Sequence, residues 1–282
     1  MTTPTRRLAA LAACLLMSAC AHGPDPAAAL TQLSAALRSR PIVLLGEVHD
    51  NAAQHALRAQ ALRALLDSGA RPALLMEQFD RERQADIDRA LARTGVTPDD
   101  VIAAGTPDGA AMQGWAWPLY RPFLALAIEY RLPIVAANVS RADTRRVLSE
   151  GLPALGFDAA VPPDIATAQA QAISDGHCGM LDDAQALRMT GAQVARDQFM
   201  ARAIEANAAR GVVLLAGNGH VRRDVGVPRW LNVDTRARSV AIGLLEPGDP
   251  NAAAFDIALT TPAQSRADPC AEMRLNAPPR TP

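Results

Sequence analysis

Four short apolar segments, each followed directly by polar or charged residues, constrain the fold of this chain more than any other feature. We expect them to form strands at residues 42–47, 73–76, 134–137 and 212–216. Short runs of branched apolar residues bounded by Pro, Gly or polar residues are typical of strands buried on both faces. Because they alternate with helical patterns, we predict an α/β fold with an open, mostly parallel sheet flanked by helices.

The segments between these strands carry helix signals. Asp50 or Asn51 can cap a helix, with Gln54 at capping-box distance from Asn51, and Gly69 is a typical helix end. Residues 151–181 and the chain beyond Thr260 are rich in Gly, Pro and polar residues, so we expect loops there, with order in the tail only near Cys270. In all, helices are expected at 26–38, 51–69, 140–150 and 182–209, and later strands at 239–245 and 255–259.

Residues 80–130 contain no strand pattern and are predicted to form a smaller helical insertion subdomain, with helices at 81–94, from 97, and from Pro118 to Tyr130. Aromatic residues make up only 4% of the chain, yet several gather here beside Met112. Such a cluster either lines a pocket for a flat apolar ligand or forms the core of the insertion. Its members are Trp115, Trp117, Tyr120 and Phe123.

Polar side chains follow all four of the first strands at the point where each strand ends. Because the carboxyl ends of parallel strands meet at one edge of a sheet, we expect these side chains to share a site. The two carboxylates and two imidazoles among them suit a divalent first-row metal ion or acid–base hydrolysis. In chain order the residues are Glu47, His49, Glu77, Asn138, Asn218 and His220.

Three other ionisable residues have ordinary explanations in the sequence. His55 lies one turn into a predicted helix and is expected to be a solvated helix residue. The adjacent Arg196 and Asp197, in the middle of the long helix at 182–209, are expected to form a solvated or sheet-end ion pair.

Residues 1–19 are predicted to be a lipoprotein signal peptide. Two arginines precede an apolar run, residues 8–16, that is too short to span a bilayer. The run ends in Met-Ser-Ala-Cys, which resembles a bacterial lipobox and would make Cys20 the acylated first residue of the mature protein. The alternative is an ordinary signal peptide cut near Ala19 or Ala21. A linker and helix over 20–40, an α/β domain over 41–262 and a Pro-rich tail over 263–282 are expected to follow.

Export places the chain in an oxidising compartment and gives its cysteines a structural role. Cys14 leaves with the signal peptide and Cys20 is acylated, so an even pair remains, Cys178 and Cys270, which we predict forms a disulfide. The competing possibility is a catalytic thiol. A bridge would tie the C-terminal tail to the domain and close a long loop, stabilising the fold by about 4–5 kcal/mol on the chain-entropy argument.

Composition excludes several classes of function. The formal net charge of −1 gives no electrostatic reason to bind nucleic acid. Every basic residue is arginine, so a phosphate-binding or Schiff-base lysine is absent. The chain has neither the Cys-x-x-Cys-His motif of covalent c-type haem nor the Gly-x-Ser-x-Gly motif of serine hydrolases.

Several segments, read together, resemble the ChaN-type haem-binding lipoproteins of the haem-binding uptake and Tiki superfamily, a wider group that includes Tiki metalloproteases, TraB-type proteins and erythromycin esterases. The resemblance covers residues 38–245 in the same order, and the first and last segments together are its most specific part. The segments are Gly46–Asp50, Leu75–Phe79, Trp117–Tyr120, Ala136–Asn138 and Leu215–His220.

The resemblance implies an open α/β sheet with a smaller helical subdomain, and haem as the ligand in iron uptake. It further implies a tyrosine as iron ligand and a homodimer that sandwiches haem. The matching tyrosine is Tyr120, beside Trp115 and Trp117, with His177 and His220 as alternatives. The same likeness assigns the Glu/His set at the strand ends to the hydrolytic or metal chemistry of the wider group.

Three functions are therefore carried forward. The first is an envelope lipoprotein that binds haem for iron acquisition; Ala21 and His22 after Cys20 carry no obvious inner-membrane retention signal, which favours the outer membrane of a Gram-negative bacterium. The second is a metal-dependent hydrolase of peptides or esters, in which Glu47, His49, Glu77 and His220 hold the metal or act as base. The third is a structural envelope lipoprotein without a ligand.

Overall fold

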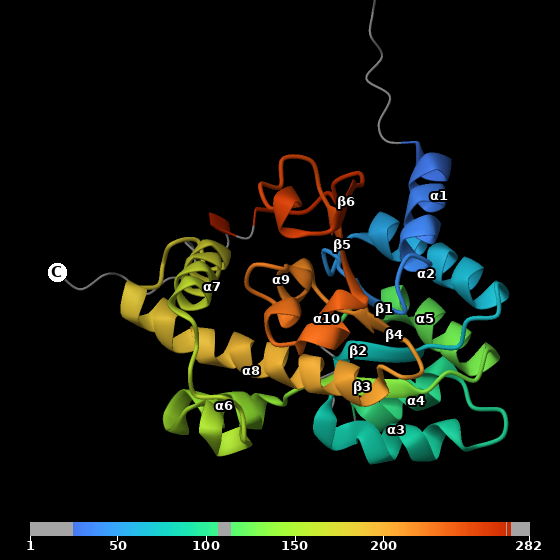
Figure 1. Cartoon of the computed structure of the whole chain (residues 1–282), viewed down its shortest axis with the longest axis horizontal. Coiled ribbons are helices and arrows are strands. Elements are labelled where there is room, and N and C mark those ends of the chain that lie inside the picture. Colours follow the sequence, from blue (N-terminus) through green and yellow to red (C-terminus); the bar gives the residue numbers. More distant parts are fainter. Residues whose placement is uncertain (1–24, 107–113, 269, 272–282) are drawn as a thin grey trace, which may run out of the picture.

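The computed structural model describes residues 25–106, 114–268 and 270–271 (Figure 1). Its centre is a six-stranded sheet in the order β3-β2-β4-β1-β5-β6, and every neighbouring pair is parallel. This confirms the predicted open parallel α/β sheet. The strands are β1 (Ile42–Leu45), β2 (Ala73–Asp80), β3 (Ile134–Asn138), β4 (Val212–Leu215), β5 (Ser239–Leu245) and β6 (Ile257–Thr260).

Helices cover both faces of the sheet, because alternate strand residues point to opposite sides. On one face Val43, Leu45 and their neighbours pack under α1 (Pro26–Leu37), α2 (Ala52–Asp67) and α5 (Trp117–Glu129). On the other face Ile42, Leu44 and their neighbours pack under the second half of α8 (Asp183–Asn207), the long helix that crosses the front of Figure 1. The central strands are therefore buried on both sides, as their continuous apolar sequences predicted.

The region between β2 and β3 is helical, as expected. A 3₁₀ turn (η1, Arg81–Arg83) leads into α3 (Gln84–Leu91), and α4 (Pro98–Gly105) follows. Thr97 and Asp100 form a capping box that starts α4. Apolar residues of α3 and α4 join the same core as α5, so this region packs against the sheet domain without a separate core.

The segment 151–181 was expected to be loop-rich, and this prediction is wrong. It contains η3 (Leu152–Leu155) and the 14-residue helix α7 (Pro163–Gly176). The Pro and Gly residues on either side led to the loop prediction. Between them lies an Ala/Gln-rich stretch that favours a helix and has a proline in its first turn, where proline is well tolerated. Together with α6 (Arg141–Glu150) and the first half of α8, it forms a satellite core at one end of the molecule.

Other boundaries also differ from the sequence expectation. A short helix, α9 (Asn218–Val221), follows β4, and β2 runs on through Glu77 to Asp80, beyond the predicted end at residue 76. The further short elements are η4 (Val227–Arg229), α10 (Val233–Ala237) and η5 (Ala252–Ala254). No helix among the described residues is long and apolar enough to cross a membrane.

The C-terminal tail is joined to the body of the protein. A disulfide links Cys178, at the end of α7, to Cys270, which confirms the predicted pair. Residues 1–19, with the expected signal peptide, and Cys20, with the expected acylation site, lie outside the described residues, as does Met112 of the aromatic segment.

Candidate functional site

The carboxylate of Glu47 organises one half of the site, directly after β1. Its side chain is buried, and its Oε1 atom accepts a 2.6 Å hydrogen bond from the hydroxyl of Tyr120 on α5. The Nδ1 atom of His49 lies 3.0 Å from the same oxygen. The other oxygen forms an ion pair with Arg58 and lies 3.2 Å from Nε2 of His55, both on α2. A single carboxylate thus joins β1, α2 and α5.

Arg58 is among the largest fully buried side chains in the described part of the protein. It donates to the backbone carbonyl of Leu45 over 3.0 Å and lies 5.3 Å from the centre of the Phe123 ring. Burial lowers the pKa of Arg58 to about 10, so it remains a cation at neutral pH. Burying this charge without Glu47 would be costly, so each partner requires the other.

His55 belongs to this buried network, and its prediction as a solvated helix residue is wrong. Its side chain is only 3% exposed, and its ring packs edge-on against Tyr120. Burial lowers the pKa of His55 to about 4, so the imidazole is neutral at physiological pH. Its Nε2 donates a 3.0 Å hydrogen bond to the backbone carbonyl of His49, which fixes the tautomer. The burial of His55 could not be predicted from the sequence, because a polar residue is ordinarily expected on the solvent side of a helix.

A second network forms around His220 on α9. Its Nδ1 lies 2.6 Å from Oδ1 of Asp197 on α8, and its Nε2 lies 3.5 Å from Oε1 of Glu77 on β2. Although burial opposes it, attraction to these two carboxylates raises the pKa of His220. Burial likewise works against Glu77, but His220 and the Gly217 backbone N–H outweigh it and lower the pKa of that carboxyl. His220 is therefore an imidazolium held between two carboxylates.

Asp197 is a member of the site that sequence reasoning missed. It was expected to pair with Arg196 in solvent or at the sheet end, but its side chain is fully buried and bonded to His220. Arg196 instead donates to Oδ1 of Asn138 at the end of β3. Burial raises the pKa of Asp197. The signal in the sequence was a carboxylate deep inside a long predicted helix, among the apolar residues Val194, Phe199 and Met200.

Gly217 lies where the two networks meet. Its backbone N–H donates a 2.8 Å hydrogen bond to Oε2 of Glu77. A Cβ atom added at this glycine would lie 2.8 Å from Cε1 and 3.0 Å from Nε2 of His49. The imidazole of His49 therefore packs over the glycine backbone, between Glu47 on one side and Glu77 on the other, and only glycine leaves that room.

His49 is the most accessible of these groups and faces a surface cavity of about 480 Å³. Its side chain is 48% exposed, its Nδ1 is held by Glu47, and its Nε2 has no hydrogen-bond partner among the described residues. The Trp115 ring packs edge-on against it at 4.8 Å. The cavity is lined by Val48, Gly217, Asn218 and Gly219 on the sheet side and by Gln169, Ala172, Ile173 and His177 of the α7 side, among others.

His177 is a second imidazole on this cavity, and it comes from the α7–α8 junction. Its Nδ1 donates a 2.7 Å hydrogen bond to the backbone carbonyl of Ile173, one turn earlier. The bond leaves Nε2 without a partner in the part of the chain that the structure describes. Two imidazoles with Nδ1 held by the protein thus line one cavity, His49 from the sheet edge and His177 from the helical satellite.

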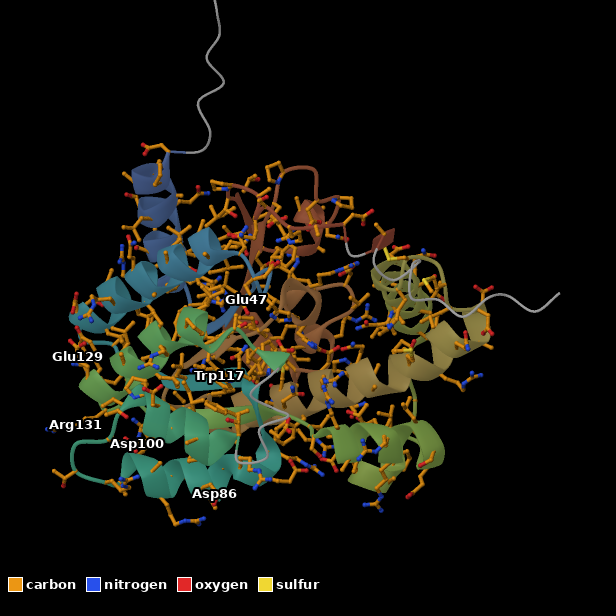
Figure 2. All side chains as sticks on the ribbon, turned by 180° about the vertical axis from the view of Figure 1, so that it is seen from behind. Glu47, Asp86, Asp100, Trp117, Glu129 and Arg131 are labelled. Carbon is orange, nitrogen blue, oxygen red and sulfur yellow. A yellow bond between two sulfur atoms is a disulfide. The ribbon has the colours of Figure 1, made fainter. Side chains whose placement is uncertain are left out.

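The predicted aromatic cluster divides into two groups. Trp117 is buried and stacks on Phe79 at 5.3 Å, and Phe123 lies in the same core. Tyr120 is also fully buried; burial raises its pKa, and its hydroxyl donates to Glu47. Trp115 alone remains half exposed beside His49. Figure 2 shows Glu47 and Trp117 in the interior, whereas Glu129 and Arg131 lie at the periphery.

The residues that sequence reasoning offered as metal ligands do come together, but not as a metal site. The oxygens of Glu47 are engaged by Tyr120, His49 and Arg58, and His220 is bonded through both ring nitrogens. No group of three or more His, Cys, Asp or Glu side chains in the described ranges is arranged to hold a metal ion. The donor set therefore does not fit the divalent metal that was the alternative cofactor.

Comparison with known proteins agrees with this architecture. A solved structure titled "Cofacial heme binding to ChaN of Campylobacter jejuni" matches 82% of this chain and 89% of its own, with a TM-score of 0.66 and 19% identity. A second, "The structure of the type III effector HopBA1", matches 84% of this chain and 94% of its own, with a TM-score of 0.50 and 15% identity. At these identities the likeness shows the fold alone. No curated protein matches the sequence significantly.

The sequence itself matches one protein family directly. Residues 33–231, well over half of the chain, match the family described as "Haem-binding uptake, Tiki superfamily, ChaN". This range contains both buried networks and the loops that carry His49 and His177. The chain is a member of the ChaN family of the Tiki superfamily.

Proposed function

We propose that this protein binds haem in the cavity between the sheet edge and α7, with His49 as the residue that holds the iron. The observation that carries the proposal is the environment of His49. Its Nδ1 is held 3.0 Å from the buried carboxylate of Glu47, and its half-exposed Nε2 faces the cavity without a partner among the described residues. Iron-binding histidines are commonly oriented by a carboxylate or carbonyl on the other ring nitrogen.

The surroundings of His49 suit a flat ligand with apolar faces. Trp115 stands edge-on to the imidazole, and Gly217 and Gly219 expose only backbone toward the cavity. Ala172 and Ile173 supply apolar contacts from α7. His177, whose Nδ1 is held by a carbonyl, would offer its Nε2 as a second group to hold a haem bound in this cavity.

The family resemblance pointed to Tyr120, and the structure gives a reason to prefer His49. The Tyr120 phenol is fully buried, burial raises its pKa, and its proton is committed to Glu47. A phenolate ligand would need the ring to leave the core and Glu47 to lose a hydrogen bond. His220, the other alternative, has both ring nitrogens engaged by carboxylates. These two residues support the position of His49 and its neighbours.

Hemin titration of the mature protein tests the proposal. Wild type should give a saturable Soret shift with one class of site. His49→Ala should weaken binding by roughly ten- to a hundredfold, as expected for the loss of an iron ligand or its orientation. The surface variant Arg63→Gln should bind like wild type. Tyr120→Phe removes a hydrogen bond to Glu47 but no iron ligand, so it should bind more weakly than wild type and more tightly than His49→Ala. Unchanged affinity in His49→Ala, or binding abolished by Tyr120→Phe with the fold intact, would contradict the assignment of His49.

We further propose that the protein is lipid-anchored through Cys20 at the cell envelope, in the outer membrane, and that it contributes to iron acquisition. The lipobox-like sequence supports the anchor, and family membership supports the physiological role. Palmitate labelling in wild type and its loss in Cys20→Ala test the anchor. Light scattering with and without haem tests a haem-dependent homodimer.

A second function, a hydrolase of esters or peptides, is favoured by one observation: the Glu47–His49 dyad forms part of the wall of a cavity. An imidazole supported by a carboxylate is a general base, and it could deprotonate a water molecule that attacks a carbonyl. A hydrolase that uses His49 as its general base would not need a bound metal ion. Assay of activated esters with wild type and His49→Ala is the test, and equal rates in the two proteins would dismiss it.

A further inference from the structure

The chain after β6 binds directly to the loop that carries His49. The Nε2 of Gln54 donates to Oγ1 of Thr261 over 2.9 Å, and Nδ2 of Asn51 donates to the carbonyl of Pro262 over 2.9 Å. The backbone N–H of Val48 donates to the same Gln54 side chain over 2.7 Å. These contacts attach the tail to Asn51 and Gln54 at the start of α2, and through Gln54 to Val48, the residue before His49.

Arg266 completes this attachment with two carboxylates. It makes paired 2.8 Å hydrogen bonds to Asp50, the residue after His49, and paired 2.8 Å hydrogen bonds to Glu246 at the end of β5. Its hydrogen bonds to Glu246 lower the pKa of that carboxyl to about 2. Geometry of this bidentate kind is more rigid than an ordinary surface ion pair. The guanidinium therefore fixes Asp50 to the sheet edge.

Four residues later the same segment is covalently attached to the opposite wall of the cavity. Cys270 is bonded to Cys178, which directly follows His177. Among the elements, α7 packs mainly on α8, so sheet packing alone does not hold its C-terminal end. Cys178 and Gly179 both have left-handed backbone conformations, which end α7 at this point.

We infer that residues 261–268, together with Cys270, are a strap that sets the separation of His49 and His177, with Arg266 and the disulfide as its two fastenings. A chain of four residues spans at most about 14 Å, so Arg266 limits how far Cys270, and with it His177, can move from the His49 loop. The inference rests on the proposed function in one respect: the ligand that the two imidazoles would hold is the haem proposed for this cavity. Arg266 and the cysteines do not touch that ligand; they are positioning residues.

Hydrogen–deuterium exchange of the full mature protein tests the strap without any ligand. In Arg266→Gln, exchange should rise in residues 47–51 and also in residues 174–180, which Arg266 does not contact. In Cys178→Ser/Cys270→Ser, it should rise in 174–180 and also in 47–51. The matched control is Arg63→Gln, which breaks an exposed ion pair between Arg63 on α2 and Glu129 on α5 and should leave both loops unchanged. If each variant affects only the loop it contacts, the strap is refuted and the tail is merely anchored at two independent points.

Haem dissociation measured by transfer to excess apomyoglobin gives the second readout. Each strap variant should release haem roughly tenfold faster than wild type, and combining Arg266→Gln with the double serine variant should add little, because either change already frees the strap. Equal release rates in all variants, with haem still bound, would overturn the inference alone. Absence of haem binding in wild type would instead defeat the proposed function, while the exchange experiment would still decide whether the strap couples the two loops.

Discussion

The hydroxyl of Tyr120 donates a 2.6 Å hydrogen bond to Oε1 of Glu47 in the protein interior. This bond links α5, from the helical region after β2, to the end of the central strand β1. The same oxygen of Glu47 lies 3.0 Å from Nδ1 of His49, so the Tyr120 hydroxyl helps to fix the carboxylate that orients His49. A tyrosine that sequence reasoning offered as an iron ligand thus supports the carboxylate behind the accessible imidazole.

Replacing Tyr120 with phenylalanine removes this hydrogen bond and leaves the ring in place. A hydrogen bond to a charged acceptor contributes about 1.5–3 kcal/mol, so we expect the free energy of unfolding to fall by that amount. Urea denaturation followed by circular dichroism measures it. A loss well under 1 kcal/mol would mean that water or another donor replaces the phenol.

Arg58→Met should be among the most damaging substitutions in the protein. It leaves the buried Glu47 carboxylate without its cation, and breaking a buried pair on one side costs about 3–5 kcal/mol. The double variant Arg58→Met/Glu47→Gln should recover much of that loss, because neither remaining group is charged. Denaturation midpoints of the two single variants and the double variant complete the cycle. Additive losses would show that the two side chains are not coupled.

The buried His55 should make the protein less stable in mild acid. Its pKa is about 4 in the folded protein and 6.5 when exposed, so below pH 6.5 the unfolded chain takes up a proton that the folded protein refuses. The stability contributed by neutral His55 is therefore complete above pH 6.5 and is lost as the pH falls toward 4. The difference amounts to about 3 kcal/mol.

Comparison with His55→Gln isolates this effect from the other ionisable groups. The free energy of unfolding of wild type should fall more steeply between pH 6.5 and 4 than that of the variant. Parallel pH profiles would place the His55 pKa near its ordinary value and contradict its burial. An NMR titration of the His55 ring provides a direct reading of the same pKa.

Gly217→Ala should disturb the site more than the fold. The added methyl group would lie 2.8 Å from Cε1 of His49, so the imidazole must shift while the buried core is untouched. We expect haem affinity to fall by roughly tenfold and the free energy of unfolding to change by about 1 kcal/mol or less. Gly191→Ala, on α8 and outside the lining of the cavity, is the matched control, since a Cβ there meets only the Val147 side chain, at 3.4 Å. Equal haem affinity in both variants would show that haem binding does not require close packing of His49 on Gly217.

The amino-acid sequence by itself determined the central sheet and the edge at which the site lies. Buried parallel strands need continuous apolar runs, so β1 to β5 were readable, and the polar residues after them had to meet at one edge. The cysteine pair was also readable, because only two cysteines remain once the signal peptide and the acylation site are set aside. Helix α7 was missed because local propensity is weak evidence beside conspicuous prolines and glycines.

Only the tertiary structure decided which polar residues share a network. His55, Arg58 and Asp197 lie on helices whose burial depends on the packing of α2 and α8 against opposite faces of the sheet. Tyr120 donates a hydrogen bond in the interior, whereas Trp115 is partly buried beside His49. Both positions follow from how α5 meets the end of β1. The spacing of residues along the chain does not predict these networks. Burial and charge pairing depend on which residues become neighbours in space, and these residues are distant in sequence.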